Sequence, residues 1–202
     1  MDNKLAYDRP IRIKESEIIP EHKQILQWTG SNKNVLEIAC HTGYFSSLLK
    51  KNNNNVTGVE LYEPALQKAR PSLEKSILGD IEKENVWDII KKDSYDDVLL
   101  MHILEHLLKP EEVLLKVKSV LKTDGYIIIA LPNVSNWVKR WDMFIGKFEY
   151  ENTGVMDRTH LRFYNYYTTI RLIENAGFRI EEYSGVSWKV RFMLLNSPIK
   201  GL

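Results

Sequence analysis

The chain has 202 residues, with 28 lysines and arginines against 27 aspartates and glutamates, and a single cysteine. This length suits one α/β domain with a sizeable core, and the balanced charge argues against a long-range attraction to nucleic acid. One cysteine makes no disulfide within the chain, which suits a reducing compartment, and no apolar run is long enough to span a bilayer. We therefore expect a cytoplasmic protein with no membrane span and no nucleic-acid partner.

A strand, a tight turn and a helix follow one another in the first quarter of the chain. The apolar run Asn34–Ile38 predicts a buried parallel strand, and Tyr44–Lys51 has the spacing of a helix. The residues between them are small or polar. Such a turn aims backbone N–H groups and the positive end of a helix dipole at the space above the strand ends. In an open α/β sheet, ligands bind there.

A second apolar run, Val56–Glu60, ends in a carboxylate. Glu60 lies roughly 20 residues beyond the turn, where an acidic side chain can accept hydrogen bonds from both hydroxyls of a ribose. The two segments together predict a nucleoside site.

Helical and strand patterns alternate along the rest of the chain. Helical patterns cover residues 18–28, 63–74, 81–92, 110–121 and 168–176, and strand patterns cover residues 76–78, 96–101, 126–131, 178–184 and 187–195. This rhythm predicts a doubly wound parallel sheet with right-handed crossovers. We expect one domain over residues 1–202, in which residues 135–166 form a lid on the substrate side.

Five segments in this order resemble class I S-adenosylmethionine-dependent methyltransferases, in a branch found with glycan and small-molecule biosynthesis. They are Glu37–Gly43, Gly58–Glu60, Gly79–Glu82, Leu104–His106 with Pro110, and Asp157–Tyr164. The resemblance covers about residues 33 to 183. It implies a Rossmann-like, seven-stranded and mostly parallel sheet with an antiparallel last strand, and S-adenosylmethionine as cofactor.

The resemblance also implies which residues hold the cofactor. The methionine part would lie on the turn, at Glu37, Ala39, Cys40, His41, Thr42, Gly43 and Tyr44. The nucleoside part would lie against Glu60, Leu61, Asp80, Ile81, Met101 and His102. Glu60 would hold the ribose, and Asp80 would accept the adenine amino group or cap the helix that follows.

The turn departs from the family pattern at two positions. Ala39 and His41 stand where the family carries glycine, and only Gly43 remains. A side chain at such a position is costly if the backbone must adopt a positive φ. This departure supports an alternative, a non-catalytic protein that keeps the fold for binding.

A polar cluster near residue 160 contains the favoured catalytic residue. His160 lies among Asp157, Arg158, Thr159 and Arg162, after the fifth strand. Methylation of a hydroxyl requires a proton acceptor, and an imidazole near its usual pKa is suitable. We expect His160, with His106 second, to act as the base, and Arg158 and Arg162 to bind substrate. Alternatively, the charged residues form a structural ion-pair network.

A candidate lid lies between these segments. Within residues 136–150, Trp137, Trp141, Phe144 and Phe148 share one helical face. We expect this face to pack over the substrate pocket, with Trp137 and the preceding Asn133 contacting substrate. The alternative is contact with a membrane surface or a lipid-linked substrate.

The acceptor we expect is a hydroxyl on a small molecule, with a sugar or glycan precursor favoured, such as a sugar nucleotide or a lipid-linked glycan. The acceptor's identity and the oligomeric state stay open, as does whether the chain is part of a longer protein.

His102, Glu105 and His106 match the H-x-x-E-H pattern of inverted zinc peptidases. On a helix, the two imidazoles would lie one turn apart with Glu105 as the base. The motif follows a strand directly, so we keep a zinc hydrolase only as a minor alternative and expect no metal site.

Overall fold

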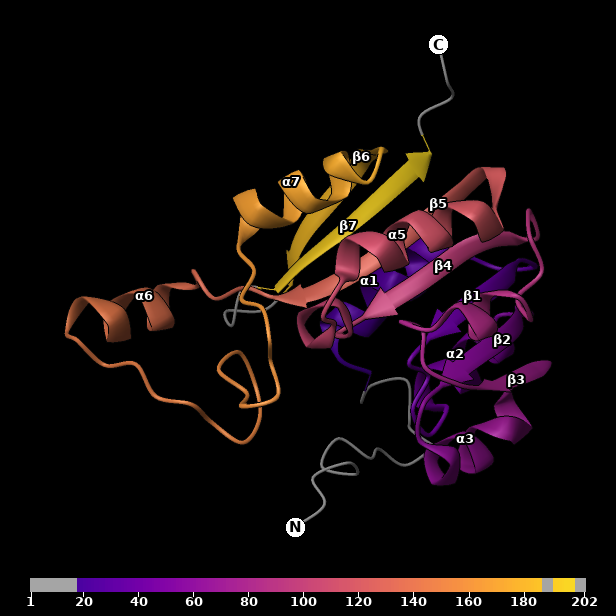
Figure 1. The fold of residues 1–202 in the computed structure, drawn as a ribbon, viewed down its shortest axis with the longest axis horizontal. Helices are drawn as coiled ribbons and strands as arrows, with labels where there is room; N and C mark the ends of the chain where they lie inside the picture. Colours follow the sequence, from indigo (N-terminus) through magenta and orange to yellow (C-terminus); the bar gives the residue numbers. More distant parts are fainter. Residues whose placement is uncertain (1–17, 187–190, 199–202) are drawn as a thin grey trace.

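The computed structural model describes residues 18–186 and 191–198, and every structural statement below concerns these ranges. The strands form one sheet in the order β3-β2-β1-β4-β5-β7-β6, drawn in Figure 1. They are β1 Asn34–Ile38, β2 Asn55–Glu60, β3 Lys75–Leu78, β4 Tyr95–Met101, β5 Leu121–Pro132, β6 Phe178–Val186 and β7 Arg191–Pro198. The first five strands run parallel, whereas β7 is antiparallel to both β5 and β6.

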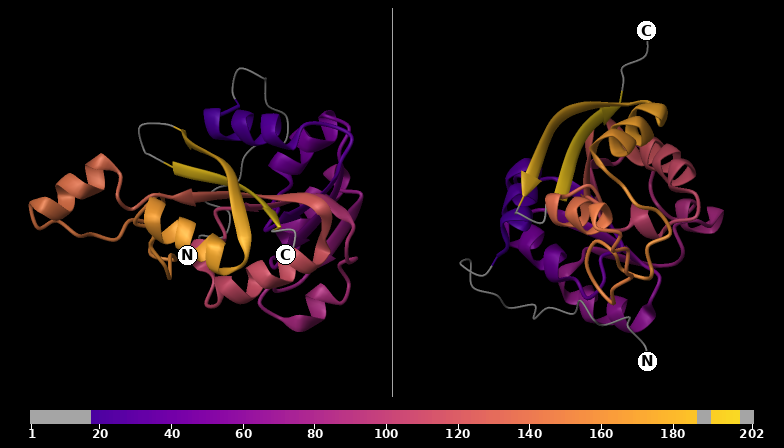
Figure 2. Two further views of the ribbon diagram at one scale, coloured as in Figure 1. Left: turned by 90° about the horizontal axis from the view of Figure 1, so that it is seen from above. Right: turned by 90° about the vertical axis from the view of Figure 1, so that its left-hand side faces the viewer.

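Helices cover both faces of the sheet (Figure 2). α1 Pro20–Thr29, α2 Tyr44–Lys51 and α3 Glu63–Ala69 pack on one face, and α5 Pro110–Val120 and α7 Tyr166–Asn175 pack on the other. Successive strand residues point to opposite faces, so Val35 joins the first core and Leu36 joins the second. This arrangement confirms the doubly wound, Rossmann-like architecture.

The strand order places the candidate site. From β1 the chain moves outward to β2 and β3, and then returns to the other side of β1 as β4. The connections after β1 and β4 therefore leave the sheet in opposite directions. Such a switch point opens a crevice at the carboxyl ends of the strands. The turn after Ile38 and the segment after Met101 both lie there.

Two predicted helices are shorter than expected. The helix from residue 63 ends at Ala69 and continues as one 3₁₀ turn, because Pro71 lacks the N–H that an α-helix requires. The helix predicted over residues 81–92 is wrong except for the four residues of α4, Glu84–Trp87. The indole N–H of Trp87 donates to the carbonyl of Ile81, which holds the preceding segment in a turn.

Other boundaries shift by a few residues. β5 begins at Leu121, five residues before the predicted start at Tyr126. The last strand begins at Arg191, whereas the expected start at residue 187 lies outside the described residues.

The segment between β5 and α7, residues 133–165, contains α6 Trp137–Phe144 and is called the lid segment below. α6 projects away from the sheet (Figure 1), and none of its residues is buried. Trp137 and Trp141 are each 59% exposed and Phe144 is 80% exposed. The expectation that this aromatic face packs over the pocket is therefore wrong, because α6 extends beyond the edge of the domain instead of folding back over it.

No helix among the described residues is long and apolar enough to cross a bilayer.

Candidate functional site

The turn after β1 has the backbone of a glycine-rich turn, although only one glycine of the family pattern remains. Ala39 has φ 58°, His41 has φ 49° and Gly43 has φ 77°, so all three lie in the left-handed region. A non-glycine residue in that region costs roughly 1–2 kcal/mol. The surrounding hydrogen bonds and packing therefore hold Ala39 and His41 in a conformation that their side chains disfavour.

Contacts from two neighbouring elements hold this turn. The N–H of Cys40 donates to the carbonyl of Val59, 3.1 Å away, which joins the turn to the end of β2. A Cβ at Gly43 would lie 2.6 Å from the Cα of Ala69, so the turn packs directly on the backbone of α3. Only glycine fits that space, and the position of α3 thus explains why Gly43 is present.

Glu60 lies at the end of β2 beside the turn. One carboxylate oxygen accepts the backbone N–H of His41 and the other accepts that of Tyr62, both at 2.9 Å. A carboxylate offers about four acceptor positions, so each oxygen retains one. Glu60 thus lies at the strand end where the sequence predicted it, and its contact with a ribose stays a prediction.

Glu37 and Cys40 are both buried beneath the turn. Burial raises the pKa of Glu37 to about 8, although Ser46 donates a hydrogen bond to its carboxylate. Burial also raises the pKa of the Cys40 thiol, with the carboxylates of Glu37 and Glu60 adding to the shift. The thiol is therefore protonated at neutral pH, which fits a small buried residue better than a nucleophile.

The end of β3 completes the nucleoside side. The N–H of Gly79 donates to the carbonyl of Glu60, so Asp80 follows directly beside the proposed ribose site. The Asp80 carboxylate accepts the N–H of Glu82, which replaces the predicted helix cap with a local turn. Leu61 is 67% exposed and can cover a bound nucleoside. Contacts of Asp80, Ile81 and Leu61 with adenine stay predictions.

β4, on the other side of β1, ends at Met101, and His102 follows it. The Nε2 of His102 lies 2.6 Å from a carboxylate oxygen of Glu21 in α1, and its Nδ1 lies 3.7 Å from Glu105. Burial alone would lower the pKa of His102, but Glu105 and Glu21 outweigh it and raise the pKa to about 9. His102 is therefore an imidazolium at neutral pH, which has no lone pair for a metal.

The pattern H-x-x-E-H does not form the helix that a zinc peptidase requires. Residues 104–106 form a single 3₁₀ turn, η4 Leu104–His106, and His102 precedes it. Its geometry and the charge on His102 argue against the zinc hydrolase with these three ligands.

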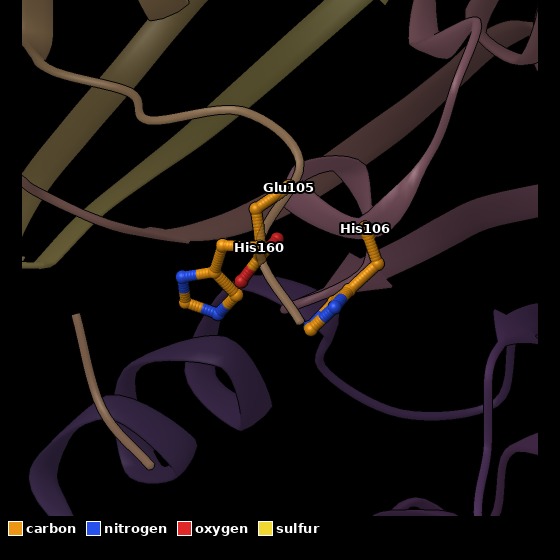
Figure 3. A group of neighbouring side chains, drawn as sticks. All are labelled: Glu105, His106 and His160. Carbon is orange, nitrogen blue, oxygen red and sulfur yellow. The ribbon is translucent and has the colours of Figure 1, made fainter. Parts of the chain in front are cut away.

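A second group of side chains, Glu105, His106 and His160, lies next to η4 (Figure 3). The carbonyl of Glu105 accepts the N–H groups of Leu161 and Arg162, at 2.8 and 3.1 Å, so the lid segment docks on η4. The rings of His106 and His160 meet edge to face with centroids 4.8 Å apart. The structure therefore brings together the two histidines predicted as catalytic, from segments more than 50 residues apart.

His160 faces an open pocket of about 500 Å³, lined with Glu149, Tyr150 and Arg158. Burial lowers the pKa of His160 below the usual value. The carboxylate of Glu105 offsets part of this effect, and neighbouring His106 adds to it. A neutral imidazole next to a pocket can accept a proton. The ring of Phe163 lies near those of Tyr150 and His160, with centroids 6.2 and 6.3 Å away.

The remaining predicted substrate residues have structural contacts. Asn133 is buried and its side-chain oxygen accepts the N–H of Ser135, which shapes the entry to α6. Arg162 donates to the carbonyl of Leu108 and so ties the lid segment to the loop before α5. Trp137 lies on exposed α6 and does not line the pocket. Arg158 alone among the four lines it, and substrate contacts of all four stay predictions.

Sequence reasoning missed Glu21 and Tyr150, and it named Glu105 only within the H-x-x-E-H motif and the family segment. Glu21 helps Glu105 to raise the pKa of His102, but its position in an amphipathic helix carries no functional signal. Tyr150 lines the pocket with no recognisable motif. Glu105 did have a signal, since it follows a strand end within a histidine-containing motif, yet its proximity to His160 depends on the fold.

Comparison with known proteins identifies the family. A family model described as a methyltransferase domain matches residues 11–183, most of the chain. The chain therefore belongs to the methyltransferase-domain family, and the predicted class, an S-adenosylmethionine-dependent methyltransferase, is confirmed at the level of the family.

Two similar curated proteins are both named ubiquinone biosynthesis O-methyltransferase. The protein of Yersinia enterocolitica is 31% identical over 159 residues, which are 72% of this chain and 64% of the relative. That of Photorhabdus laumondii is 30% identical over 158 residues, which are 72% and 65% of the two chains. The chain thus spans a little under two thirds of the length of these relatives.

Solved structures support the fold. The PH0226 protein of Pyrococcus horikoshii aligns over 93% of both chains with a TM-score of 0.71 and 21% identity. A magnesium protoporphyrin IX methyltransferase of Synechocystis, solved with bound SAH, covers 88% of this chain and 82% of its own, with a TM-score of 0.67 and 13% identity. At these identities the likeness shows the fold alone.

The relatives' names give no support to the expected role in glycan biosynthesis.

Proposed function

We propose that this protein transfers the methyl group of S-adenosylmethionine to a hydroxyl of a small-molecule acceptor. One observation carries the proposal most directly: the turn after β1 is hydrogen-bonded to Glu60 so that each carboxylate oxygen keeps a free acceptor position. Those two positions match the two hydroxyls of the cofactor's ribose. The family match supports the same cofactor.

The cofactor would lie across the switch point of the sheet. The methionine part would lie on the turn that includes Ala39 and His41, and the adenine would lie between the ends of β3 and β4, near Asp80 and Met101. The cofactor's sulfonium already carries the reactive methyl group, so the protein chiefly aligns it with the acceptor oxygen.

The acceptor would bind between η4 and the lid segment. The pocket beside His160 is lined with one aromatic ring, Tyr150, one cation, Arg158, and one carboxylate, Glu149. Such a pocket suits a flat, hydroxylated ring with an acidic substituent, because aromatic rings stack and guanidinium pairs with carboxylate or phosphate. The name of the relatives, which refers to ubiquinone biosynthesis, agrees with an aromatic hydroxyl better than with the sugar hydroxyl expected from sequence.

The cofactor site is tested by calorimetric titration with S-adenosylhomocysteine. We expect the wild-type protein to bind it and Glu60→Ala to bind at least tenfold more weakly, because two charge-assisted hydrogen bonds are lost. Glu63→Ala is the matched control, since Glu63 is exposed at the start of α3 and should change nothing. A folded wild-type protein that does not bind would favour the non-catalytic binding protein instead.

The acceptor is tested by methyl transfer to a panel of catechols, hydroxybenzoates and sugar nucleotides. We expect turnover of the aromatic hydroxyls. We also expect Arg158→Gln to reduce turnover at least tenfold for the acidic members of the panel alone. Both results together support the proposed pocket. Turnover of sugar nucleotides alone would restore the acceptor expected from sequence.

A further inference from the structure

We propose that Glu105, His106 and His160 bind a divalent transition-metal ion of the zinc type at the acceptor pocket. The binding site stands on the geometry of these three residues, and its catalytic role rests on the proposed function. The proposal replaces the expectation from sequence that the chain has no metal site.

The three side chains converge on one point from two segments (Figure 3). One carboxylate oxygen of Glu105 and one ring nitrogen from each histidine all lie within 4.8 Å of one another. A first-row ion with bonds of about 2.0–2.2 Å holds its ligands roughly 3–3.5 Å apart. Small side-chain rotations therefore suffice to close the three groups on an ion.

Glu105 is the strongest evidence. Its side chain is 1% exposed, and neither carboxylate oxygen has a hydrogen bond within the described part of the chain. His102 pairs with Glu105 at 3.7 Å, which is too long for a hydrogen bond, and makes its short contact with Glu21. A buried carboxylate without hydrogen bonds is costly, and buried charges are normally paired or coordinate a metal. The carboxylate lies between the two imidazoles, so an ion there would satisfy it.

Both histidines are held as metal ligands usually are. The Nδ1 of His106 lies 3.1 Å from the carbonyl oxygen of Thr159, and the Nδ1 of His160 lies 3.1 Å from that of Val155. A carbonyl can only accept, so each Nδ1 carries the proton and each Nε2 keeps its lone pair. Metal-binding histidines characteristically donate their second N–H to a backbone carbonyl in this way.

The ligand set indicates the kind of ion. Two imidazoles and one carboxylate are typical of catalytic zinc sites, which keep a fourth position open, and of sites for other divalent first-row ions. Calcium and magnesium prefer an all-oxygen environment, which this cluster does not offer. His160 borders the open pocket, so the free position of the ion would face the acceptor.

The ion would activate the acceptor hydroxyl. A hydroxyl bound to it has a lowered pKa and releases its proton to solvent. The oxygen lone pair then forms the bond to the methyl carbon while the S–CH₃ bond breaks, and that electron pair stays on sulfur. The products are the methyl ether, S-adenosylhomocysteine and one proton. His106 and His160 would serve as ligands and not as the base expected from sequence.

The test is metal binding by the full chain after treatment with a chelator. We expect zinc to bind one ion per chain by calorimetry, and cobalt(II) to give visible d–d absorption. His160→Ala and Glu105→Gln should each weaken zinc binding at least tenfold. His22→Gln removes a histidine of α1 outside the cluster and should leave the zinc affinity unchanged. No stoichiometric zinc in the wild-type protein, or unchanged affinity in His160→Ala, would overturn the proposal.

Binding of S-adenosylhomocysteine separates this proposal from the proposed function. The variants that lose zinc should still bind S-adenosylhomocysteine, which also shows that they are folded. A wild-type protein that binds S-adenosylhomocysteine but no zinc overturns the metal site and leaves the methyltransferase. Zinc binding without cofactor binding supports the metal site and overturns the proposed function.

Discussion

The turn after β1 and the lid segment are held in opposite ways. The turn, residues 39–43, is strained at two positions, yet hydrogen bonds to β2 and close packing on α3 fix it. The lid segment carries an exposed helix, and its two ends pair with each other at Asn133 and Tyr164. It is tied to the rest of the domain near its C-terminal end, through Arg162 with Leu108. Packing around the turn stabilises it enough to offset its unfavourable backbone angles, whereas the lid segment is held by a few hydrogen bonds.

This difference bears on function. A cofactor that is the same in every member of a family suits a site built into the core. An acceptor that differs among members suits a segment outside it, where residues can change without loss of the core. The cluster of Glu105, His106 and His160 lies where the lid segment docks on η4, with one member from the lid segment.

The largest expected contrast is between two tryptophans. Trp87 is 7% exposed and its indole N–H is hydrogen-bonded, whereas Trp141 is 59% exposed on α6. We expect Trp87→Ala to lower the free energy of unfolding by about 4 kcal/mol and Trp141→Ala by about 0.5 kcal/mol. Urea unfolding followed by circular dichroism measures both. A large loss with Trp141→Ala would show that α6 packs on the domain in solution.

A second contrast uses two glycines with the same φ of 77°, Gly43 in the turn and Gly146 in the lid segment. In Gly43→Ala the strain of positive φ adds to a clash with Ala69, so we expect a loss of about 3 kcal/mol. Gly146 has nothing within 4 Å of an added Cβ, and Gly146→Ala should cost about 1 kcal/mol. Equal losses in urea unfolding would mean that packing on α3 contributes nothing to the turn.

Stability of the core should fall as the pH rises from about 5 to about 8. The pKa of Glu37 is about 8 in the folded protein against an ordinary 4.5, so the folded state binds more protons in this window. The free energy of unfolding therefore decreases with pH there. Glu37→Gln should remove about 2 kcal/mol of the decrease between pH 6 and 8.

The pH test has its control in the lid segment. Glu151 is an exposed carboxylate that pairs with Lys139, and Glu151→Gln should leave the slope unchanged. Denaturant midpoints at pH 6, 7 and 8 give the slopes. An identical slope in wild-type protein and Glu37→Gln would show that Glu37 is ionised in the folded state.

The smallest expected effects concern two helix caps. Asn165 caps α7 with a reciprocal hydrogen bond to Thr168, and Asn136 caps α6. α7 contributes Leu172 and Ile173 to the core, so Asn165→Ala should lower the global free energy of unfolding by about 1 kcal/mol. Asn136→Ala should cost about as much within α6 alone. Amide hydrogen exchange distinguishes the global loss from the local one. We expect global unfolding to become slower in neither variant.

The sequence by itself determined the fold class and the positions of the turn after β1 and of Glu60. Apolar runs of strand length alternating with helical patterns specify a doubly wound sheet, because each pattern depends on local periodicity. The turn after Ile38 and the carboxylate of Glu60 were placed correctly because the end of a strand and the start of a helix are marked in the residues themselves. Even the cost at His41 followed from the residue type, and its φ of 49° agrees.

Only the tertiary structure decided what depends on contacts between distant segments. The four-residue α4 results from the indole of Trp87, and the raised pKa of His102 results from Glu105 together with Glu21, 81 positions away. The same holds for His160, whose approach to Glu105 requires the lid segment to dock on η4. Periodicity indicates on which face of a helix or strand a residue lies, but it does not indicate which distant side chain packs against that face. The hydrogen bonds and burial that bring these groups together exist only after the chain has folded.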